Sequence, residues 1–369
     1  MRVLIRSLMI AVAAFTLTAC ASRYEQAQLP PEPESTELEK AEVRSSQNMK
    51  DLISLAESGN RQAMMSLAQF YDQRMKQKGG DALSLMWLRK AADSGLADAM
   101  YEIAKMHDFG DGIPEDNDQA IFWYHKAAEL GHVSAMVNLG VIYDTGEGVK
   151  EDNAKARAFY LSAAQQKDSD AQYNLGLMYE NGEGIEQDYK QAVSWYQLAA
   201  NQGDLNAMVN LGRLYHLGEG AAQSEQQARY WFLRAAKAGE ASAQFNLAGI
   251  YMSPEAQAPD FEQAARWYRQ AAHGGIRPAM WQLANMYRVG YGVKKDSRKA
   301  FRWTHKAAYS GVIPAQYQLG LMFLQGEGTP VSFKLGMHWI SVAARQGYPQ
   351  AQAYVRAIMQ EKHPVQIQM

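Results

Sequence analysis

A pattern that repeats every 36 residues restricts the folds open to this chain more than any other feature. The stretch NLGVIYDTGEGVKED begins at Asn138, and its close copy NLGLMYENGEGIEQD begins at Asn174, an offset of 174 − 138 = 36 residues. No insertion breaks the register between Gly59 and Gly347, which makes (347 − 59)/36 = 8 full units. Repeats of this length are typical of stacked supersecondary units, each of which buries its apolar face only against its neighbours.

Several columns of the repeat are apolar or aromatic. One column is alanine: Ala63, Ala99, Ala135, Ala171, Ala207, Ala243, Ala279, Ala315 and Ala351. A later column is mostly tryptophan: Trp87, Trp123, Phe159, Trp195, Trp231, Trp267, Trp303 and Trp339. An Ala-Ala pair follows each of these aromatics four residues later. The alanines let helices approach closely, and the tryptophans, Trp195 and Trp231 among them, are expected to fill the core between repeats.

The spacing within a unit predicts two helices. Ala135, Leu139 and Tyr143 fall at i, i+4 and i+8, on one face of a helix, and a second apolar face runs from about residue 153 to 166. A Gly-x-Gly separates them, as at Gly146 and Gly148, where glycine supplies the left-handed conformation of a helix C-cap. Asp152 then stands in N-cap position for the second helix. A phosphate-binding loop would need a preceding strand and a Gly-Lys-Ser/Thr ending, and neither is present.

These columns resemble the Sel-one-like repeat (SLR) family, a branch of the tetratricopeptide class. The matching features are the alanine column, Asn-Leu-Gly, the loop tyrosine, Gly-x-Gly, the capping Asp, Trp-Tyr and Ala-Ala-x-x-Gly, over about residues 59 to 361. The resemblance implies an all-α, right-handed α-solenoid over residues 47–361, with eight full units, a capping helix before them and a terminal half-unit after them. It also implies a scaffold or adaptor whose first helices line the concave side.

Two columns on that concave side are candidates for partner binding. One is apolar where a surface column would be polar: Met65, Tyr101, Val137, Tyr173, Val209, Phe245, Trp281 and Tyr317. The other changes from acidic to neutral or basic: Asp72, Asp108, Asp144, Glu180, His216, Met252, Arg288 and Leu324. Aromatic residues in a groove favour binding, and a charge gradient orients a bound partner. The alternative is that tight curvature of the superhelix buries the first column between adjacent first helices.

From these two columns we take a predicted groove. Its residues are Tyr101, Asp108, Asp144, Tyr173, Glu180, Phe245, Trp281, Arg288 and Tyr317. The recurring asparagines Asn138, Asn174, Asn210 and Asn246 either hold a bound peptide backbone or hydrogen-bond the adjoining repeat.

The N-terminus predicts export and lipidation. A basic start, an apolar run and small residues over 1–19 are typical of a signal peptide, and Leu17-Thr18-Ala19-Cys20 resembles the bacterial lipoprotein signal, in which Cys20 is lipidated. Residues 20–46 then form an acidic, proline-containing tether, and 362–369 form a C-terminal tail. Because Ala21 and not Asp follows the cysteine, we expect an outer-membrane protein of a Gram-negative bacterium, anchored on the periplasmic side.

Catalytic and cofactor chemistry are not indicated. The eight histidines are scattered, and the acidic loop around Asp111 and Glu115 does not match the EF-hand spacing. After removal of Arg2 and Arg6 the formal charge is (37 − 2) − 39 = −4, and a weakly acidic domain without a basic cluster argues against nucleic acid as a partner. We therefore predict a non-enzymatic scaffold for envelope proteins, without metal or cofactor. The alternatives are a glycan or peptidoglycan binding module and, less favoured, a cell-wall or β-lactam hydrolase.

Overall fold

The computed structural model describes residues 48–75, 80–253 and 259–362. The predicted signal peptide, Cys20, the tether and the tail beyond Lys362 lie outside the described residues. Within the described ranges every regular element is a helix and no strand occurs. The chain forms two compact units, Met1–Ala171 with Glu183–Ile185 and Gln172–Gly182 with Glu186–Met369.

A helix over residues 48–57 opens the described chain. It is followed by α3 (Arg61–Met75), α4 (Gly80–Asp93), α5 (Ala97–Phe109), α6 (Asn117–Glu129), α7 (Val133–Thr145), α8 (Asn153–Gln165), α9 (Ser169–Asn181), α10 (Tyr189–Gln202), α11 (Leu205–Leu217), α12 (Glu225–Lys237), α13 (Ala241–Met252), α14 (Phe261–His273), α15 (Arg277–Val289), α16 (Ser297–Tyr309), α17 (Ile313–Gln325), α18 (Phe333–Arg345) and α19 (Pro349–Lys362).

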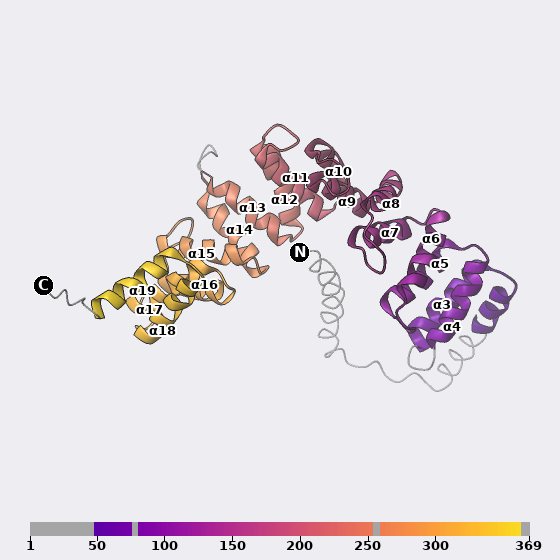
Figure 1. Ribbon diagram of the computed structural model, residues 1–369, viewed down its shortest axis with the longest axis horizontal. Helices are drawn as coiled ribbons and strands as arrows, with labels where there is room; N and C mark the ends of the chain where they lie inside the picture. The colour runs from indigo at the N-terminus through magenta and orange to yellow at the C-terminus, as the bar shows by residue number, and fades with distance from the viewer. Residues whose placement is uncertain (1–47, 76–79, 254–258, 363–369) are drawn as a thin grey trace, which may run out of the picture. The chain divides into compact units, whose positions relative to one another are not determined.

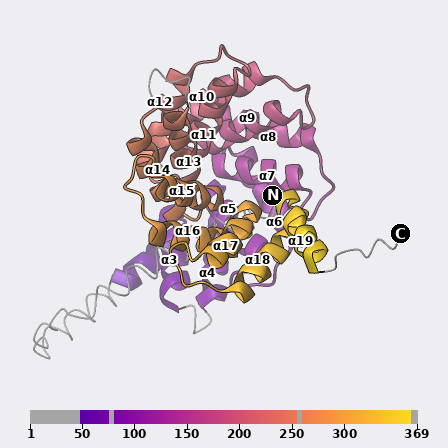
Figure 2. The same cartoon turned by 90° about the vertical axis from the view of Figure 1, so that its left-hand side faces the viewer.

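The helices pack as successive pairs, which confirms the predicted all-α solenoid. In the first unit α3 packs on α4, α5 on α6 and α7 on α8, and each of these pairs contacts the next. In the second unit the contacts run without a break from α10 to α19. Two views of the molecule show the paired helices, such as α17 and α18, side by side (Figures 1 and 2). Among the described residues, the helix at 48–57 and α19 are not joined to a second helix in this way, as expected of a capping helix and a half-unit.

The ends of the helices follow the predicted capping chemistry. Helix α7 ends at Gly146, which has the left-handed conformation (φ 71°) and donates its N–H to the Ile142 carbonyl. Helix α8 begins after Asp152, whose side chain accepts a hydrogen bond from the Lys155 N–H. These two local signals fix the length of the loop between the helices of a pair.

The second glycine of each Gly-x-Gly has a different purpose from the one we predicted. Gly148 also has a positive φ, but a Cβ added there would lie 2.5 Å from the Asn117 Cβ of the preceding repeat. At Gly328 an added Cβ would overlap the Ser297 carbonyl. The sequence analysis assigned both glycines to the helix end, which is right only for the first. The second one lets each loop rest on the start of the preceding second helix.

The core lies between the helices of a pair and between successive pairs. The Ala-Ala pairs are almost fully buried, for example Ala199 and Ala200 at 0% exposure. Their small size allows close approach, as does Gly140, where an added Cβ would lie 2.5 Å from the Tyr160 ring. Replacing such small residues with larger ones would force the helices apart.

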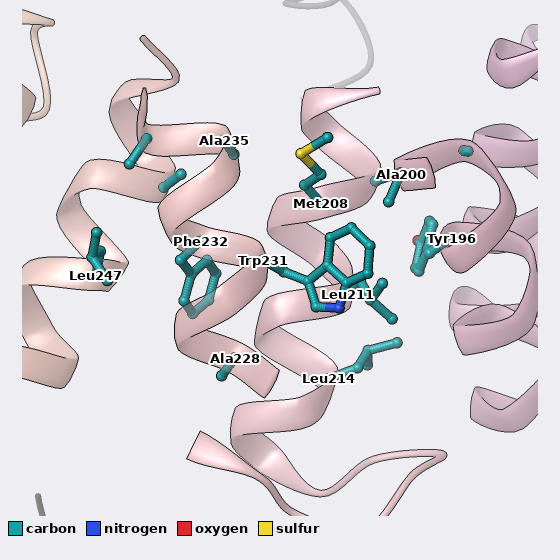
Figure 3. Close-up of a cluster of buried hydrophobic side chains, with 14 of the residues drawn as sticks. Tyr196, Ala200, Met208, Leu211, Leu214, Ala228, Trp231, Phe232, Ala235 and Leu247 are labelled. Carbon is teal, nitrogen blue, oxygen red and sulfur yellow. The ribbon is translucent and has the colours of Figure 1, made fainter. Parts of the chain in front are cut away.

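The largest fully buried side chains include three tyrosines that directly follow the tryptophan column, Tyr124, Tyr160 and Tyr196. Trp231 is 3% exposed, as predicted, and lies beside Leu211 and Leu214 (Figure 3). Trp195, however, is only half-buried, whereas Tyr196 is fully buried. The prediction for Trp195 is therefore wrong. Side-chain volume alone favours the tryptophan as the core residue. The buried face of the helix, however, points in the direction of the tyrosine, which therefore lies in the core.

Candidate functional site

The predicted groove residues of the first unit lie at the contact between repeats. The Tyr101 ring is half-buried and stacks on the His132 ring, with 4.4 Å between centroids and 21° between planes. Burial raises the pKa of the Tyr101 hydroxyl, while Lys105 and a hydrogen bond with Asn138 oppose this shift. Asn138 also hydrogen-bonds Tyr124. Here the recurring asparagine joins two tyrosines of one repeat to the next repeat.

The second unit repeats this arrangement at Tyr173. Its ring lies 5.8 Å from the Tyr196 ring, and both hydroxyls hydrogen-bond Asn210 of the following repeat. Burial raises the pKa of Tyr173 to about 12. Of the two roles considered for the asparagines, the contact with the adjoining repeat is the one that the structure shows for Asn138 and Asn210.

The remaining groove aromatics are half-buried as well. Phe245 lies 5.6 Å from the Tyr268 ring, and Tyr317 lies 5.5 Å from the Tyr348 ring. Trp281 packs against a buried cluster that includes Leu319. One side of each of these side chains therefore contributes to the packing of the repeats, and the rest remains accessible to solvent.

The acidic column is hydrogen-bonded to the buried tyrosines. The Tyr124 hydroxyl donates to Asp108 Oδ2 at 3.0 Å, and the Tyr196 hydroxyl donates to Glu180 Oε2 at 2.9 Å. Asp144 lies close enough to Tyr160 to raise the pKa of that tyrosine further, after the larger effect of burial. These carboxylates are neighbours of tyrosine hydroxyls, a pairing that the sequence analysis read only as a charge gradient.

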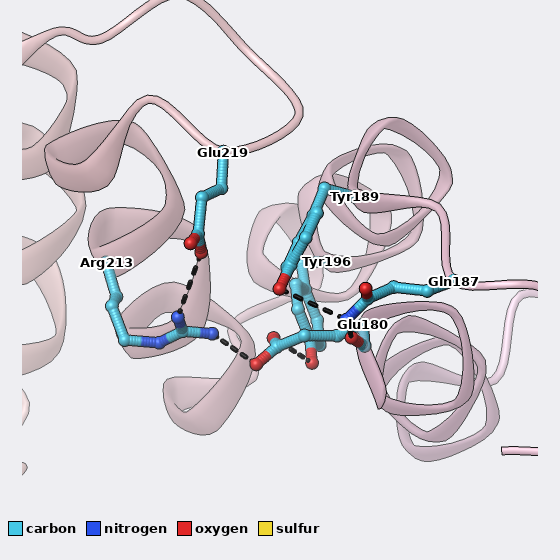
Figure 4. Close-up of polar contacts among 6 residues, drawn as sticks. All are labelled: Glu180, Gln187, Tyr189, Tyr196, Arg213 and Glu219. Carbon is cyan, nitrogen blue, oxygen red and sulfur yellow. Dashed lines mark hydrogen bonds and ion pairs between the residues drawn. The ribbon is translucent and has the colours of Figure 1, made fainter. Parts of the chain in front are cut away.

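Glu180 interacts with side chains of its own repeat and of the next repeat. Besides Tyr196 it binds Arg213, which comes from the next repeat and also lies 3.5 Å from Glu219 (Figure 4). Gln187 closes the adjacent loop by donating to the Glu180 carbonyl at 2.7 Å. Glu180 is thus part of an ion-pair network within the second unit, and its side chain is only 16% exposed.

Helix α15 departs from this pattern. In the second to fourth repeats a carboxylate lies near a buried tyrosine, whereas this repeat has Arg288 and the almost fully buried Thr304 at the same places. The Nε atom of Arg288 is buried and finds no hydrogen-bond partner in the described part of the chain. Trp281 lies two turns before Arg288 on the same helix face.

Several histidine and acidic side chains take part in packing and helix capping. Burial lowers the pKa values of His107, His125, His132 and His305. His125 contacts the Tyr143 hydroxyl at 3.0 Å, and Asp116 of the acidic loop caps α6. Among the described residues, no three His, Cys, Asp or Glu side chains are grouped as metal ligands. None of the helices in the described ranges has both the length and the apolar character needed to span a bilayer.

The small net charge of the whole chain hides a separation of negative and positive charge along the sequence. Residues 48–258 contain 18 Lys and Arg and 28 Asp and Glu, a formal charge of 18 − 28 = −10. Residues 259–369 contain 14 and 5, a formal charge of 14 − 5 = +9. The expectation that no basic cluster exists is therefore wrong for the last repeats. A charge count for each group of repeats would have shown this.

The fold defines the class of protein: an α-solenoid of paired helices, as in tetratricopeptide-type repeats. A family model described as "Sel1 repeat" matches residues 61–96, 97–132, 133–168, 169–204, 205–240, 241–276, 277–312 and 313–348. The chain belongs to the Sel1 repeat family. Repeats of this family bind proteins, and the fold is typical of protein-interaction scaffolds.

Several bacterial structures are similar. A Sel1 repeat protein from Oxalobacter formigenes is 27% identical, with 84% of this chain and 90% of that chain covered and a TM-score of 0.68. The c5321 protein, a protective antigen of uropathogenic Escherichia coli, is 24% identical over 85% and 90%, with a TM-score of 0.40. A putative sel1 repeat protein from Klebsiella pneumoniae is 27% identical over 55% and 99%, with a TM-score of 0.36. No curated protein matches this sequence.

Proposed function

We propose that this protein is a non-enzymatic scaffold that recruits proteins to the bacterial envelope. The observation that carries the proposal is the pair Trp281 and Arg288 on α15. Both residues are half-buried, and no other repeat has a tryptophan or an arginine at these two places. An aromatic ring beside an arginine without an internal partner is the composition of an interface anchor.

The place of action follows from the N-terminal sequence. Cys20 at the end of a signal-like segment supplies a lipid anchor, and the residue Ala21 favours the outer membrane. The acidic tether over residues 20–46 then links the repeats to the membrane on its periplasmic side. Recruitment of partners into a secretion or envelope-assembly complex is the role that fits an anchored solenoid without catalytic groups.

Substitution of Cys20 tests the anchor. We expect Cys20→Ala to move the protein from the membrane fraction to the soluble fraction after signal cleavage, because a protein without acyl chains loses its hydrophobic attachment. Fractionation of cells in high salt, followed by immunoblotting, measures this. If the variant stayed in the membrane fraction under high salt, the lipid anchor would be ruled out.

Substitution of Trp281 tests the binding face. Crosslinking in cells first identifies the partner, and the purified partner is then titrated with wild type and variants. We expect Trp281→Ala to weaken binding by more than about 1 kcal/mol, as interface anchors do, while the melting temperature stays near that of wild type. Trp303→Ala is the matched control, because Trp303 is also half-buried but lies in the packing column of the same repeat.

Two results would contradict this assignment. One is normal partner binding by Trp281→Ala. The other is an early melting transition for Trp281→Ala, which would make this residue a core residue like Trp231. A glycan array tests the alternative of carbohydrate recognition, because aromatic rings also stack on sugars. If the protein bound a specific glycan and Trp281→Ala lost this binding, the ligand of this face would be a glycan and not a protein.

A further inference from the structure

The loops of the last repeats form a continuous edge with the starts of the second helices. The loop that contains Gly292 rests on the start of α14, since an added Cβ would overlap the Phe261 carbonyl. The next loop rests in the same way on Ser297 at the start of α16. Helix α18 begins directly after that loop. Residues 289–299 and 327–335 therefore make up one edge, which we call the C-terminal edge.

This edge carries five exposed apolar side chains. The exposed fractions are 68% for Val331, 61% for Phe333 and 44% for Leu335, with 46% for Val289 and 51% for Tyr291. All five belong to loop residues, to the last residue of α15 or to the first turn of α18. Such side chains cost solubility and add little to the packing of the repeats.

Phe333 and Phe261 occupy equivalent positions but differ in their exposure to solvent. Phe261 occupies the equivalent first position of α14, and Tyr291 of the following loop covers it, with ring centroids 5.2 Å apart and planes 17° apart. Phe333 is 61% exposed at the same place in the last full repeat. A side chain that is a packing residue in one repeat is thus presented to solvent in another.

Basic residues alternate with these apolar side chains. Lys294, Lys295, Arg298 and Lys334 are all exposed on the C-terminal edge, together with Lys299. The acidic residues of the edge are Asp296, which caps α16 and lies 3.6 Å from Lys299, and the half-buried Glu327. The corresponding loops of earlier repeats are acidic instead, for example at Glu147, Glu151, Glu183 and Glu186.

We propose that the C-terminal edge binds the surface of an anionic lipid bilayer. Exposed lysines and arginines are attracted to anionic headgroups. Val331, Phe333 and Leu335 enter the boundary between headgroups and acyl chains, where bulky apolar side chains are stabilised. A bilayer fits this edge better than an acidic protein does. The apolar residues extend from a loop and a helix start, with Lys334 between Phe333 and Leu335, so no compact apolar centre of the kind that protein interfaces use is formed.

The negative charge of the earlier repeats opposes contact of those repeats with the bilayer. A surface with a formal charge of −10 over residues 48–258 is repelled by the same bilayer that attracts the +9 of residues 259–369. The contact does not depend on Cys20 or on the Trp281 face. With a lipid anchor present, it would act as a second attachment at high effective concentration, so that the two attachments reinforce one another.

The test uses the full mature chain, residues 20–369, with Cys20→Ala to remove any lipid. Cosedimentation is measured with vesicles of phosphatidylcholine alone and with vesicles in which about one third of the lipid is phosphatidylglycerol, at low salt and at high salt. We expect binding to the anionic vesicles at low salt, little binding to the neutral ones, and loss of binding as salt screens the headgroups. Absence of binding to anionic vesicles at low salt would overturn the proposal.

Matched pairs of variants locate the contact. Phe333→Ser should weaken vesicle binding at least about fivefold, whereas Phe109→Ser should not change it, because Phe109 is equally exposed at 61% but ends α5 in an acidic region. Lys294→Glu should weaken binding about tenfold, and Lys150→Glu, at the equivalent place in an acidic loop, should not. Circular dichroism checks that each variant remains folded.

Other outcomes would exclude a bilayer as the occupant. Equal effects within either matched pair would mean that the C-terminal edge is not the contact. Binding of an acidic protein or of DNA that is lost in Lys294→Glu but kept in Phe333→Ser, without vesicle binding, would assign the basic residues to a different partner. Because the lipid is absent from every protein in this test and none of the matched variants changes Trp281, failure here leaves the proposed scaffold function open to its own tests.

Discussion

Single positions of this repeat accept chemically different side chains when they make the same bond. The residue before several first helices accepts a hydrogen bond from an N–H of the first turn, and it is Asn60 at α3, His132 at α7, Asp168 at α9 and Asp204 at α11. The capping role is constant, whereas the response to pH is not. Burial lowers the pKa of His132, and burial raises the pKa of Asp204.

His132 should make the first unit sensitive to acid. Its Nδ1 accepts from the Ala135 N–H at 3.2 Å, and a protonated imidazole cannot accept this bond. Because the pKa of His132 is lower in the folded state than its usual 6.5, the stabilisation is complete above pH 6.5 and is lost as pH falls through the folded pKa. Asp98, with Oδ1 3.6 Å from Nε2, opposes part of this loss.

The variant His132→Asn tests this pH dependence, since Asn60 already caps α3 in the same way. Urea unfolding at pH 7 and pH 5 should show a smaller loss of stability for the variant than for wild type, by up to about 1 kcal/mol, the value of a helix cap. The buried His125, His107 and His305 remain in both proteins and cancel in the comparison. An equal loss in the two proteins would show that His132 does not contribute to the acid response.

At the scale of the element, the Gly-x-Gly segment between paired helices meets two structural requirements within three residues. The first glycine ends a helix, and the second allows contact with the preceding repeat. Both need a positive φ, so sequence alone assigns them the same role. Only the position of the neighbouring helix start distinguishes them.

Alanine substitutions separate these requirements. Gly311 and Gly328 both have a positive φ, 89° and 72°, but an added Cβ meets nothing within 4 Å at Gly311, whereas at Gly328 it overlaps the Ser297 carbonyl. We expect Gly311→Ala to cost about 1 kcal/mol, the usual penalty of the left-handed conformation. Gly328→Ala should cost at least about twice as much. Denaturant titration measures both, and equal costs would mean that the loop moves away from α16 without penalty.

At the scale of the molecule, each repeat depends on its immediate neighbours. Contacts join each helix pair to the next within a unit, so stability is expected to be a sum of local terms. The ends are different from the middle, because the helix at 48–57 and α19 are single. Leu55 illustrates this: it is 48% exposed, whereas the residues at its place in later repeats, such as Ala91 and Ala127, are fully buried.

This dependence predicts different unfolding after two equivalent substitutions. Trp231 and Trp339 occupy the same column and are 3% and 9% exposed, so truncation of either to alanine should cost about 3–5 kcal/mol locally. Trp339→Ala should release α17 to α19 and leave the earlier helices protected, whereas Trp231→Ala should destabilise the middle of the second unit. Hydrogen exchange resolved along the chain measures this. Identical loss of protection throughout in both variants would contradict local stabilisation.

The sequence by itself determined the repeat, the two helices of each unit and their caps. These features depend on interactions between residues close in the chain, such as Gly146 with Ile142 and Asp152 with Lys155. The same local patterns recur every 36 residues, which makes them easy to recognise in the sequence. It also identified the small residues of the core, because close packing requires alanine or glycine wherever helices meet.

Only the tertiary structure decided which side of each helix is buried and what the polar residues contact. Trp195 and Tyr196 are neighbours in sequence, and a rotation of one residue along the helix separates the half-buried from the fully buried side chain. Glu180 looks like one member of a charge gradient until Tyr196 and Arg213 are placed beside it. Contacts between residues distant in the chain depend on how one repeat packs on the next. The sequence pattern of a single repeat does not specify that packing.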